Sequence, residues 1–528
     1  MQRRLVPLLA VGLMASLAPG IATAAPTAAP QPKPGPLASY EKQKPTWKRC
    51  APDLPAAFQC AMLKVPMDYK RPAGKKLEIA VSRWKTSVKG KRQGVLLFNP
   101  GGPGGAGLDM PVFMKELMPK QLLDGYDLIG FDPRGVAASS PVACGLNESD
   151  AQWPRPYKAK TFAKDVAWAK GVADKCRKKQ GEKLRYITTR NTARDMDILR
   201  IVLGEKKLNY VGYSYGTHLG AVYSQLFPAK TGRFVLDSAV DPKLTWRGMI
   251  QIWAEGTEPA FKRWAAWTAA RDARYGLGST EAQVTKAWWD LIAQADRKPI
   301  IVDGEPYNGD DIRNDLRATF FDVTAAADRV VELKKAAATP GRRASVTIPR
   351  QQERPSFRPM QTLDNVEASF WSVVCADNSA AWSRDTEQYR KDAVRDKARY
   401  PLYGDFTSNI KPCAFWDKSV EPAITINNRV PSLILQNEWD PATPYAAGVG
   451  MRKALKGSKL VSVKNGQGHG VYLFGGSTCA DKLTTNYLLT GKLPAKDTTC
   501  TAPVPRSGKE SAPADRLPNP LPQLPHRF

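Results

Sequence analysis

The sequence predicts an α/β fold, in which a mostly parallel sheet is flanked by helices and interrupted by a helical cap domain. Short apolar runs that end in Gly, Pro, Asp or Asn are typical of buried strands. They begin at Val95, Tyr126, Leu208, Arg233, Ser432 and Lys459. Helical patterns lie between them, and such alternation favours a parallel sheet. The alternation stops near Asp241 and resumes near Ser432, and within this interval eight of the 14 tryptophans fall between Trp246 and Trp382.

The first 24 residues predict a signal peptide. A basic head, MQRR, precedes an apolar run that Pro and Gly interrupt, and Ala22-Thr23-Ala24 forms an A-x-A cleavage site. A membrane anchor is the alternative, but no positive stop-transfer flank follows the run. No other segment approaches the ~20 apolar residues of a spanning helix. We therefore expect a secreted, extracellular protein without stable membrane insertion.

The rest of the 528-residue chain is long enough for one large or two ordinary domains. Residues 25–39 are rich in Pro and Ala, which predicts a linker or propeptide. We expect the α/β core in two parts, 40–241 and 412–505, the helical cap domain at 242–411, and a Pro-rich tail at 506–528. Within the cap we expect most tryptophans to pack in its core and one or two to line a pocket.

One helix between the strands is expected in TARDMDILRIVLG. Met196, Leu199, Val202 and Leu203 fall on one helical face, and Thr192 is the expected N-cap.

The net charge of +28 raises the question of nucleic-acid binding. The Lys and Arg residues are scattered along the chain, without a basic helix or a module of stacked aromatic and basic residues. We therefore expect no nucleic-acid partner. A soluble basic surface is the default interpretation, and weak association with an anionic cell wall is the alternative.

The eight cysteines are candidates for disulfides if the protein is exported. Eight cysteines allow 105 pairings. Four local pairs demand the least loop-closure entropy, and they are Cys50 with Cys60, Cys144 with Cys176, Cys375 with Cys413 and Cys479 with Cys500. The chain has no CxxC motif and no Cys/His cluster, so we expect no metal site.

The stretch Gly212-Tyr213-Ser214-Tyr215-Gly216 fits the nucleophile-elbow pattern. In that pattern a serine stands on a sharp turn from a strand to a helix, and glycines are needed because the backbone leaves no room for Cβ atoms. A strand pattern precedes this stretch and a helical pattern follows it. Ser214 is therefore the predicted nucleophile, and a structural Gly/Ser turn is the alternative.

A serine nucleophile needs a base, and the chain has three histidines. His218 lies one helical turn beyond Ser214 on a helix that runs away from the elbow, so core packing is its expected role. His526 lies in the Pro-rich tail. His469 follows a strand in a glycine-rich loop that can carry an imidazole over the sheet edge. We therefore predict His469 as the base.

The third member of a triad holds the imidazole tautomer and stabilises its positive charge. In this fold the triad residues follow one another along the chain as Ser, then Asp or Glu, then His. Asp440 closes the strand SLILQNEW and lies 29 residues before His469. Glu438 is the competitor, and Asp440 is favoured. The helical cap domain is thus inserted before the strand that carries this aspartate.

An oxyanion hole combines the residue after the nucleophile with a loop that follows an earlier strand. NPGGPGGAG at 99–107 is such a loop, because its glycines bring backbone N–H groups close to a substrate. We predict the backbone N–H groups of Gly102 and Tyr215 as the donors, and a plain tight turn is the alternative for the glycines.

These pieces, in this order, resemble the secreted tripeptidyl aminopeptidases of filamentous Gram-positive bacteria, in the prolyl-aminopeptidase-like branch of the α/β-hydrolase fold. The resemblance runs from about Trp47 to Cys500, and the part from about Ala414 resembles the C-terminal segment of that group. It rests on NPGGPGGAG, GFDPRGVAASSPVAC, RNTARDMDILR, GYSYGTHLGAVYSQLFP, NEWDPATPYAAG and GQGHG. Two positions depart from the family pattern. Pro100 stands where relatives often have the histidine of HGGPG, and Ala137 stands where they often have glycine.

The resemblance implies the same triad, Ser214, Asp440 and His469, and the local disulfides. It also implies release of tripeptides or similar short peptides from a free N-terminus through an acyl-enzyme on Ser214, without a cofactor. A carboxylate in the cap is the natural group to bind the substrate ammonium. The candidates are Glu255, Glu258, Glu367 and Asp377. The fold also serves other hydrolases, so a secreted carboxylesterase or a cell-envelope serine endoprotease is the alternative.

Overall fold

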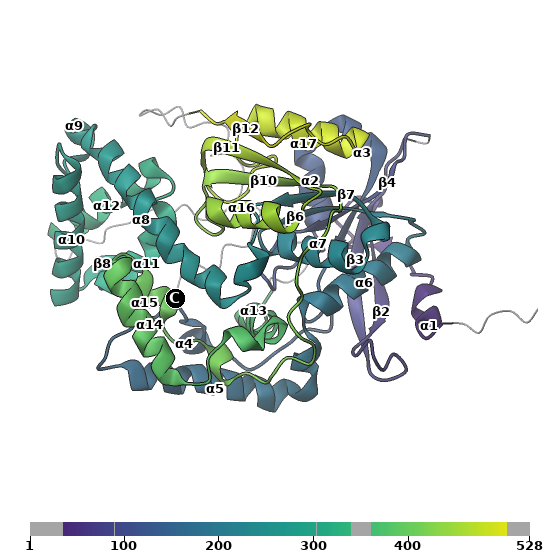
Figure 1. Ribbon diagram of the computed structural model, residues 1–528, viewed down its shortest axis with the longest axis horizontal. Helices are drawn as coiled ribbons and strands as arrows, with labels where there is room; N and C mark the ends of the chain where they lie inside the picture. The colour runs from purple at the N-terminus through teal and green to yellow at the C-terminus, as the bar shows by residue number, and fades with distance from the viewer. Residues whose placement is uncertain (1–34, 89, 303, 339–360, 504–528) are drawn as a thin grey trace, which may run out of the picture.

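The computed structural model describes residues 35–88, 90–302, 304–338 and 361–503 (Figure 1). The predicted signal peptide, most of the predicted linker, and the predicted tail 506–528 with His526 lie outside the described residues.

A ten-stranded sheet runs through the molecule in the order β1-β2-β3-β5-β4-β6-β7-β10-β11-β12. From β5 to β12 all neighbouring strands are parallel, whereas β1, β2 and β3 join antiparallel at one edge. The strands are β1 Lys48–Arg49, β2 Phe58–Pro66, β3 Lys76–Trp84, β4 Gly94–Asn99, β5 Tyr126–Phe131, β6 Leu208–Tyr213, β7 Thr231–Asp237, β10 Ser432–Trp439, β11 Lys459–Gln467 and β12 Thr498–Thr501. Each of the six predicted apolar runs forms one of these strands, and the predicted α/β fold class is confirmed.

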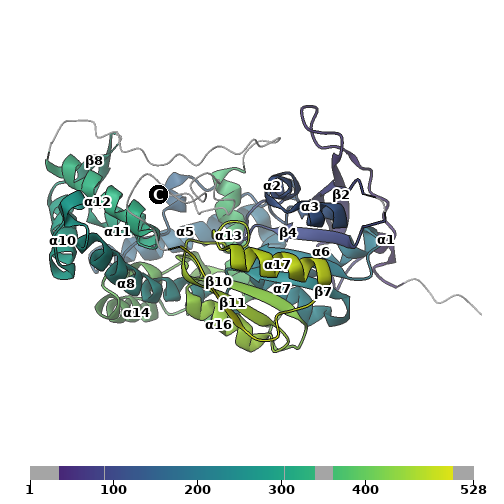
Figure 2. The ribbon, with the colours of Figure 1, turned by 90° about the horizontal axis from the view of Figure 1, so that it is seen from above.

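Helices cover both faces of the sheet (Figure 2). One face packs against α2 Met110–Leu117, α3 Lys120–Gly125 and α17 Thr478–Thr490. The other packs against α6 Thr189–Val202, α7 Tyr215–Leu226 and α16 Tyr445–Ala454. Side chains alternate between the faces, so that Leu96 and Phe98 join the first layer and Val95 and Leu97 the second. This two-sided burial explains why the strand sequences are almost continuously apolar.

Three further helices precede α6 in the chain: α1 Ala38–Glu41, α4 Glu148–Ala151 and α5 Phe162–Gln180. The expected start of α6 needs a correction. Thr188, not Thr192, is its N-cap, because the Thr188 side chain accepts a hydrogen bond from the Asn191 N–H. Thr192 lies one turn inside the helix and donates its hydroxyl to the Thr188 carbonyl at 3.0 Å.

An insertion between β7 and β10 packs beside the sheet (Figure 1). It contains α8 Arg247–Ala269, α9 Asp272–Tyr275, α10 Glu281–Arg297, α11 Gly309–Thr319, α12 Val323–Ala338, α13 Leu363–Asp377, α14 Thr386–Arg399 and α15 Gly404–Ser408, and a hairpin of β8 Ile300–Val302 and β9 Glu305–Tyr307. The hairpin is an element that the sequence patterns did not indicate.

The insertion packs in two parts. Trp264 and Trp288, both fully buried, belong to a separate apolar cluster formed by α8, α10, α11 and α12. In contrast, Trp371 on α13 and Trp382 belong to the main core of the molecule. The insertion is therefore anchored to the sheet domain through α13, while its outer part has a core of its own.

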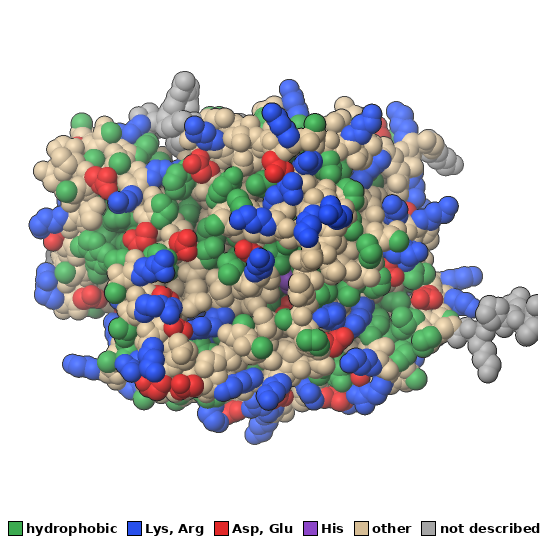
Figure 3. All heavy atoms as spheres, viewed as in Figure 1, with side chains coloured by type: hydrophobic (Ala, Val, Ile, Leu, Met, Phe, Trp, Pro, Cys, Tyr) green, Lys and Arg blue, Asp and Glu red, His purple; other side chains and the backbone are tan. Residues whose placement is uncertain are grey.

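Four disulfides join the local pairs Cys50–Cys60, Cys144–Cys176, Cys375–Cys413 and Cys479–Cys500. Among the described residues, no helix combines the length and the apolar character needed to span a bilayer. Lys and Arg side chains are scattered over the face shown in Figure 3 and are interleaved there with Asp and Glu.

Candidate active site

Ser214 is the one residue that connects β6 to α7, and its backbone angles, φ 55° and ψ −123°, are strained. A non-glycine residue with positive φ is held there only when its surroundings over-determine it. The Ser214 N–H donates to the Asp237 carbonyl at 2.9 Å. The turn is so tight that a Cβ on Gly212 would lie 2.5 Å from the Gly216 carbonyl oxygen. This is the geometry that exposes a serine hydroxyl above a sheet edge.

The structure brings His469 and Asp440 together. The His469 Nδ1 lies 2.9 Å from each carboxylate oxygen of Asp440. Asp440 directly follows β10, and His469 lies on the loop after β11 between Gly468 and Gly470, whose φ angles are 85° and 103°. Glycine is needed on both sides of His469 because other residues rarely adopt such angles.

The Asp440 carboxylate is fully buried and held by the turn that follows it. The N–H groups of Ala442 and Thr443 donate to its Oδ1 at 2.9 and 2.8 Å, and the Thr443 hydroxyl donates to its Oδ2 at 2.9 Å. The competitor Glu438 accepts a hydrogen bond from the Asn465 N–H at 2.7 Å instead. The geometry therefore agrees with Asp440 as the partner of His469.

The loop after His469 is fixed to the end of β7. The Gly470 N–H donates to the Ser238 hydroxyl at 2.8 Å, and the N–H groups of Val471 and Tyr472 donate to the Asp237 carboxylate. Burial raises the pKa of Asp237 to about 7, and these hydrogen bonds oppose that rise. Because the Asp237 carbonyl also accepts from Ser214, one residue links the serine turn to the histidine loop.

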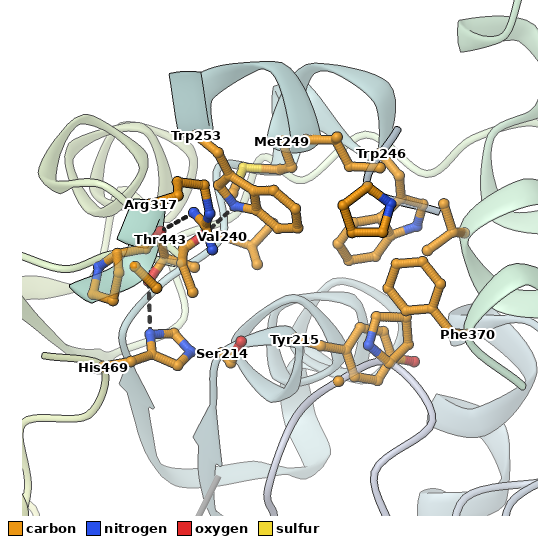
Figure 4. Close-up of a pocket in the computed structure, with 18 of the residues that line it drawn as sticks. Ser214, Tyr215, Val240, Trp246, Met249, Trp253, Arg317, Phe370, Thr443 and His469 are labelled. Atoms are coloured by element: carbon orange, nitrogen blue, oxygen red, sulfur yellow. Dashed lines mark hydrogen bonds between the residues drawn. The ribbon is translucent and has the colours of Figure 1, made fainter. Parts of the chain in front are cut away.

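Ser214 and His469 line one cavity of about 190 Å³ between the sheet edge and the insertion. Figure 4 shows the two side chains next to each other on one side of the cavity, with Trp246, Met249 and Trp253 opposite them. Most of the lining is apolar and comes from Trp153, Val240, Trp246, Met249, Ile250, Trp253, Phe370 and Val374. Such a surface suits apolar substrate groups.

Gly102 and Tyr215, the predicted oxyanion donors, line the same cavity. Neither backbone N–H donates a hydrogen bond to another described residue. Gly101 is needed for this arrangement, because a Cβ there would lie 2.8 Å from the Ser214 Cβ. Two unused backbone donors beside a serine hydroxyl can bind a developing oxyanion.

His218 is buried beneath the site, 2 % exposed, and its ring meets Trp246 edge to face with centroids 5.0 Å apart. Burial lowers the pKa of His218 to about 3, so its imidazole is neutral at pH 7. It does not line the cavity that contains Ser214.

The four cap carboxylates expected to bind a substrate ammonium do not line this cavity. Glu255 is exposed, and Glu258 accepts from the Leu402 N–H at 2.9 Å. Glu367 is buried in α13, and Asp377 accepts from the Trp246 indole at 3.0 Å and from Thr189. Burial raises the pKa of Asp377 to about 6.

Among the described residues that line the cavity, Asp315 of α11 is the one that carries a carboxylate. Its Oδ2 accepts from the Arg329 Nε and Nη2, both at 3.1 Å. Its Oδ1 accepts no hydrogen bond from the described part of the chain. Sequence reasoning missed this residue, because Asp315 lies in GDDIRNDLRAT among other charged side chains and no motif distinguishes it.

Ala137, the second departure from the family pattern, has a φ of 44°. Glycine adopts this left-handed conformation without strain, which accounts for the glycine expected there. Within the described ranges, no group of three or more His, Cys, Asp or Glu side chains could hold a metal ion.

Two sequence families match the chain. Residues 94–283 match the family described as alpha/beta hydrolase fold, and residues 400–500 match the TAP-like protein family. A tripeptidyl aminopeptidase of Streptomyces lividans is 35% identical over 475 residues, which cover 86% of each chain.

More distant relatives carry other names. The serine protease Hip1 of Mycobacterium tuberculosis is 29% identical over 85% of this chain and 88% of its own. A protein named carboxylesterase B from the same species is 29% identical over 93% of this chain and 96% of its own. A solved hydrolase structure from Pseudomonas aeruginosa PA01 aligns with a TM-score of 0.32 at 14% identity, over 79% of this chain and 95% of that one.

Proposed function

We propose that this chain, which belongs to the tripeptidyl aminopeptidase family of α/β-hydrolases, releases tripeptides or similarly short peptides from the free N-terminus of peptides and proteins. The chain is a serine hydrolase of the peptidase type. The observation that carries the proposal is that Ser214, His469 and one carboxylate, that of Asp315, line the same cavity. A nucleophile, its base and a group of opposite charge to an ammonium are what an N-terminal peptidase needs in one cavity.

In the proposed mechanism, the Ser214 Oγ attacks the scissile carbonyl while His469 accepts the hydroxyl proton. His469 then gives that proton to the leaving amine, and an acyl-enzyme remains on Ser214. Water attacks the ester, again with His469 as base, and the released peptide frees Ser214. Asp440 supports both steps, because its contact with Nδ1 at 2.9 Å fixes the ring and stabilises its positive charge.

The tetrahedral oxyanion would accept hydrogen bonds from the N–H groups of Gly102 and Tyr215. Removing one such donor in a serine protease typically costs about 100- to 1000-fold in kcat. Both groups belong to the backbone, so a change of the Tyr215 side chain does not remove the donor there.

Recognition of a free N-terminus requires an acceptor for an ammonium that loses its water shell. We assign this role to Asp315. Arg329 holds one carboxylate oxygen and so fixes the side chain, while Oδ1 remains available to a ligand. We further propose that the insertion acts as a cap domain that limits how much of a chain enters, since α8 and α11 form the wall opposite Ser214.

Secretion is part of the proposal. Four disulfides are typical of a protein that folds in an oxidising compartment. The A-x-A site at 22–24 would then mark the end of the signal peptide.

Two other functions remain candidates because relatives bear those names. A carboxylesterase would use the same Ser214 chemistry, and the apolar cavity would fit its acyl group. An endoprotease would cleave without regard to the N-terminus.

A pair of chromogenic substrates tests the proposal. Ala-Ala-Pro-anilide with a free amino group is compared with the acetylated peptide, and Ser214→Ala serves as the blank. We expect rapid cleavage of the free peptide and little of the blocked one. Equal cleavage of both would identify an endoprotease, and hydrolysis of simple esters alone would identify an esterase.

A further inference from the structure

We propose that Trp253 and Arg317, two side chains of the insertion, are positioning residues that hold the Asp440 turn in the geometry needed by His469. The inference rests on the proposed role of Asp440 in the triad. If these two side chains hold the turn, the insertion supports the catalytic triad as well as forming a wall of the cavity.

The turn after Asp440 is held from two sides. The carbonyl of Pro441 accepts from the Arg317 Nη1 at 2.8 Å, and the N–H of the same peptide unit, on Ala442, donates to Asp440 at 2.9 Å. The next peptide unit repeats the pattern. The carbonyl of Ala442 accepts from the Trp253 Nε1 at 2.6 Å, and the N–H of Thr443 donates to Asp440 at 2.8 Å.

Two successive peptide units therefore connect the insertion to the carboxylate. A donor on the carbonyl polarises the amide and strengthens the hydrogen bond that its N–H makes. Each bond from the insertion thus aligns a donor that fixes Asp440. Loss of either bond frees one peptide unit to rotate, and Asp440 then loses a fixed partner.

The residues that flank the turn also meet the insertion. The Arg263 guanidinium lies 4.1 Å from the ring centroid of Trp439, the residue before Asp440. On the other side, a Cβ on Gly256 of α8 would lie 2.8 Å from the Pro444 side chain, so the helix and the turn approach closely. Helix α8 therefore contacts the chain both before and after the aspartate.

No carboxylate pairs with Arg317 in the described part of the chain. Its guanidinium lies 4.9 Å from the Trp253 ring and 5.3 Å from the Tyr403 ring, measured to the centroids. Burial lowers the pKa of Arg317, and Tyr403 and the Asp440 carboxylate oppose that fall. The hydrogen bond to the turn and the nearby Asp440 charge are thus its main polar interactions.

Trp253 and Arg317 also line the cavity next to His469 (Figure 4). A substrate that fills the cavity therefore touches the side chains that hold the acid turn. Substrate contact and alignment of Asp440 are coupled through these two residues.

The test uses Trp253→Phe, which removes the indole donor and keeps an aromatic ring, and Arg317→Met, which removes the guanidinium. Arg317→Lys restores one donor. The matched controls are Trp267→Phe and Arg271→Met, because Arg271 stacks on Trp267 at 4.1 Å and donates to its carbonyl at 3.0 Å, without contact to the turn. Each variant is assayed with the free tripeptide anilide and with p-nitrophenyl acetate, and its thermal unfolding is recorded.

We expect Arg317→Met and Trp253→Phe to lower kcat by about 10- to 100-fold, the cost of a small misplacement of a catalytic group, with KM changed less than about threefold. Arg317→Lys should recover part of the loss, and the controls should keep wild-type kcat at a similar melting temperature. A rise in KM at unchanged kcat would overturn the inference, because Arg317 and Trp253 would then only bind substrate. Equal losses in the controls would overturn it too.

The ester assay separates this inference from the proposed function. A wild-type enzyme that hydrolyses the ester and not the peptide would refute the exopeptidase proposal, while the effect of the variants on ester kcat would still decide the role of Trp253 and Arg317.

Discussion

Glu367 is a buried carboxyl group without a hydrogen-bond partner on either oxygen among the described residues. Burial raises its pKa from 4.5 to about 8. Because the pKa is higher in the folded state, the stability from this group is present in full below pH 4.5. It is lost as the pH rises through 8.

We predict that Glu367→Gln gains stability relative to the wild type as the pH rises from 5 to 8. The difference in the free energy of unfolding should grow by up to ~1.4 kcal/mol for each pH unit. Urea denaturation of both proteins at several pH values measures it. Glu255→Gln is the control, since Glu255 is exposed. A difference that stays flat over this range would contradict the prediction.

At the same scale, local sequence was enough to indicate Ser214, Asp440 and His469. Each follows a strand end. Ser214 has a positive φ and lies between Gly212 and Gly216, and His469 lies between two glycines with positive φ, so glycines mark both positions in the sequence. Asp315 could not be found this way. Its position in the cavity depends on how α11 packs over the sheet edge, and its neighbours Asp310 and Asp311 look the same in the sequence.

Among the elements, α11 carries the polar wall of the cavity: Asn314, Asp315 and Arg317 all line it. The Asn314 side chain is held by the Tyr403 hydroxyl at 2.6 Å, and Asp315 by Arg329. Helix α11 is thus fixed in place before a substrate binds.

We predict that Asp315→Asn raises KM for the free tripeptide anilide by about 10- to 100-fold, since a hydrogen bond to a charged group contributes about 1.5–3 kcal/mol. Cleavage of the acetylated peptide should not change, so the preference for the free amino group falls. Steady-state kinetics with both substrates measure this. An unchanged preference, with Glu255→Gln as the control, would assign the ammonium site elsewhere.

The elements themselves were predictable to different degrees. Of the six predicted strands, β4, β5 and β6 are buried at every residue, and β7 and β10 are buried over most of their length. Strand β11 is buried mainly in its apolar first half. Strands β2 and β3 were not indicated, because at the antiparallel edge they mix exposed polar residues with buried apolar ones. The start of α6 was placed one turn late, since Thr188 and Thr192 offer the same capping group and packing decides between them.

For the whole molecule, the cavity is built by contacts between distant parts of the chain. Trp253 and Ala442 are 189 residues apart, and Gln361 and Gly104 are 257 apart. The sequence indicated an insertion over the active edge. It could not indicate which insertion residues meet the Asp440 turn, because such contacts leave no local pattern.

The disulfides also act at this scale. The Cys375–Cys413 bond joins α13 to the turn Pro412–Phe415 and spans 38 residues, which include α14 and α15. The chain-entropy relation gives about 4 kcal/mol for a loop of this length and about 3 kcal/mol for the 10-residue separation of Cys50–Cys60.

We therefore predict that replacing both Cys375 and Cys413 by serine lowers the melting temperature more than replacing both Cys50 and Cys60. Calorimetry without reductant measures both double variants. A thiol count on the denatured, unreduced wild type should find no free cysteine. A larger loss in the Cys50/Cys60 variant would contradict the larger loop-closure contribution expected for Cys375–Cys413.

The central claim is that Ser214 is the nucleophile of this cavity, and covalent labelling tests it most directly. The purified protein is treated with a fluorophosphonate, and the adduct is located by mass spectrometry while residual activity is followed. The account predicts one adduct per chain, on Ser214, with activity lost in proportion to labelling and no adduct in a folded Ser214→Ala variant. An adduct on another residue, or full activity in the labelled protein, would contradict it.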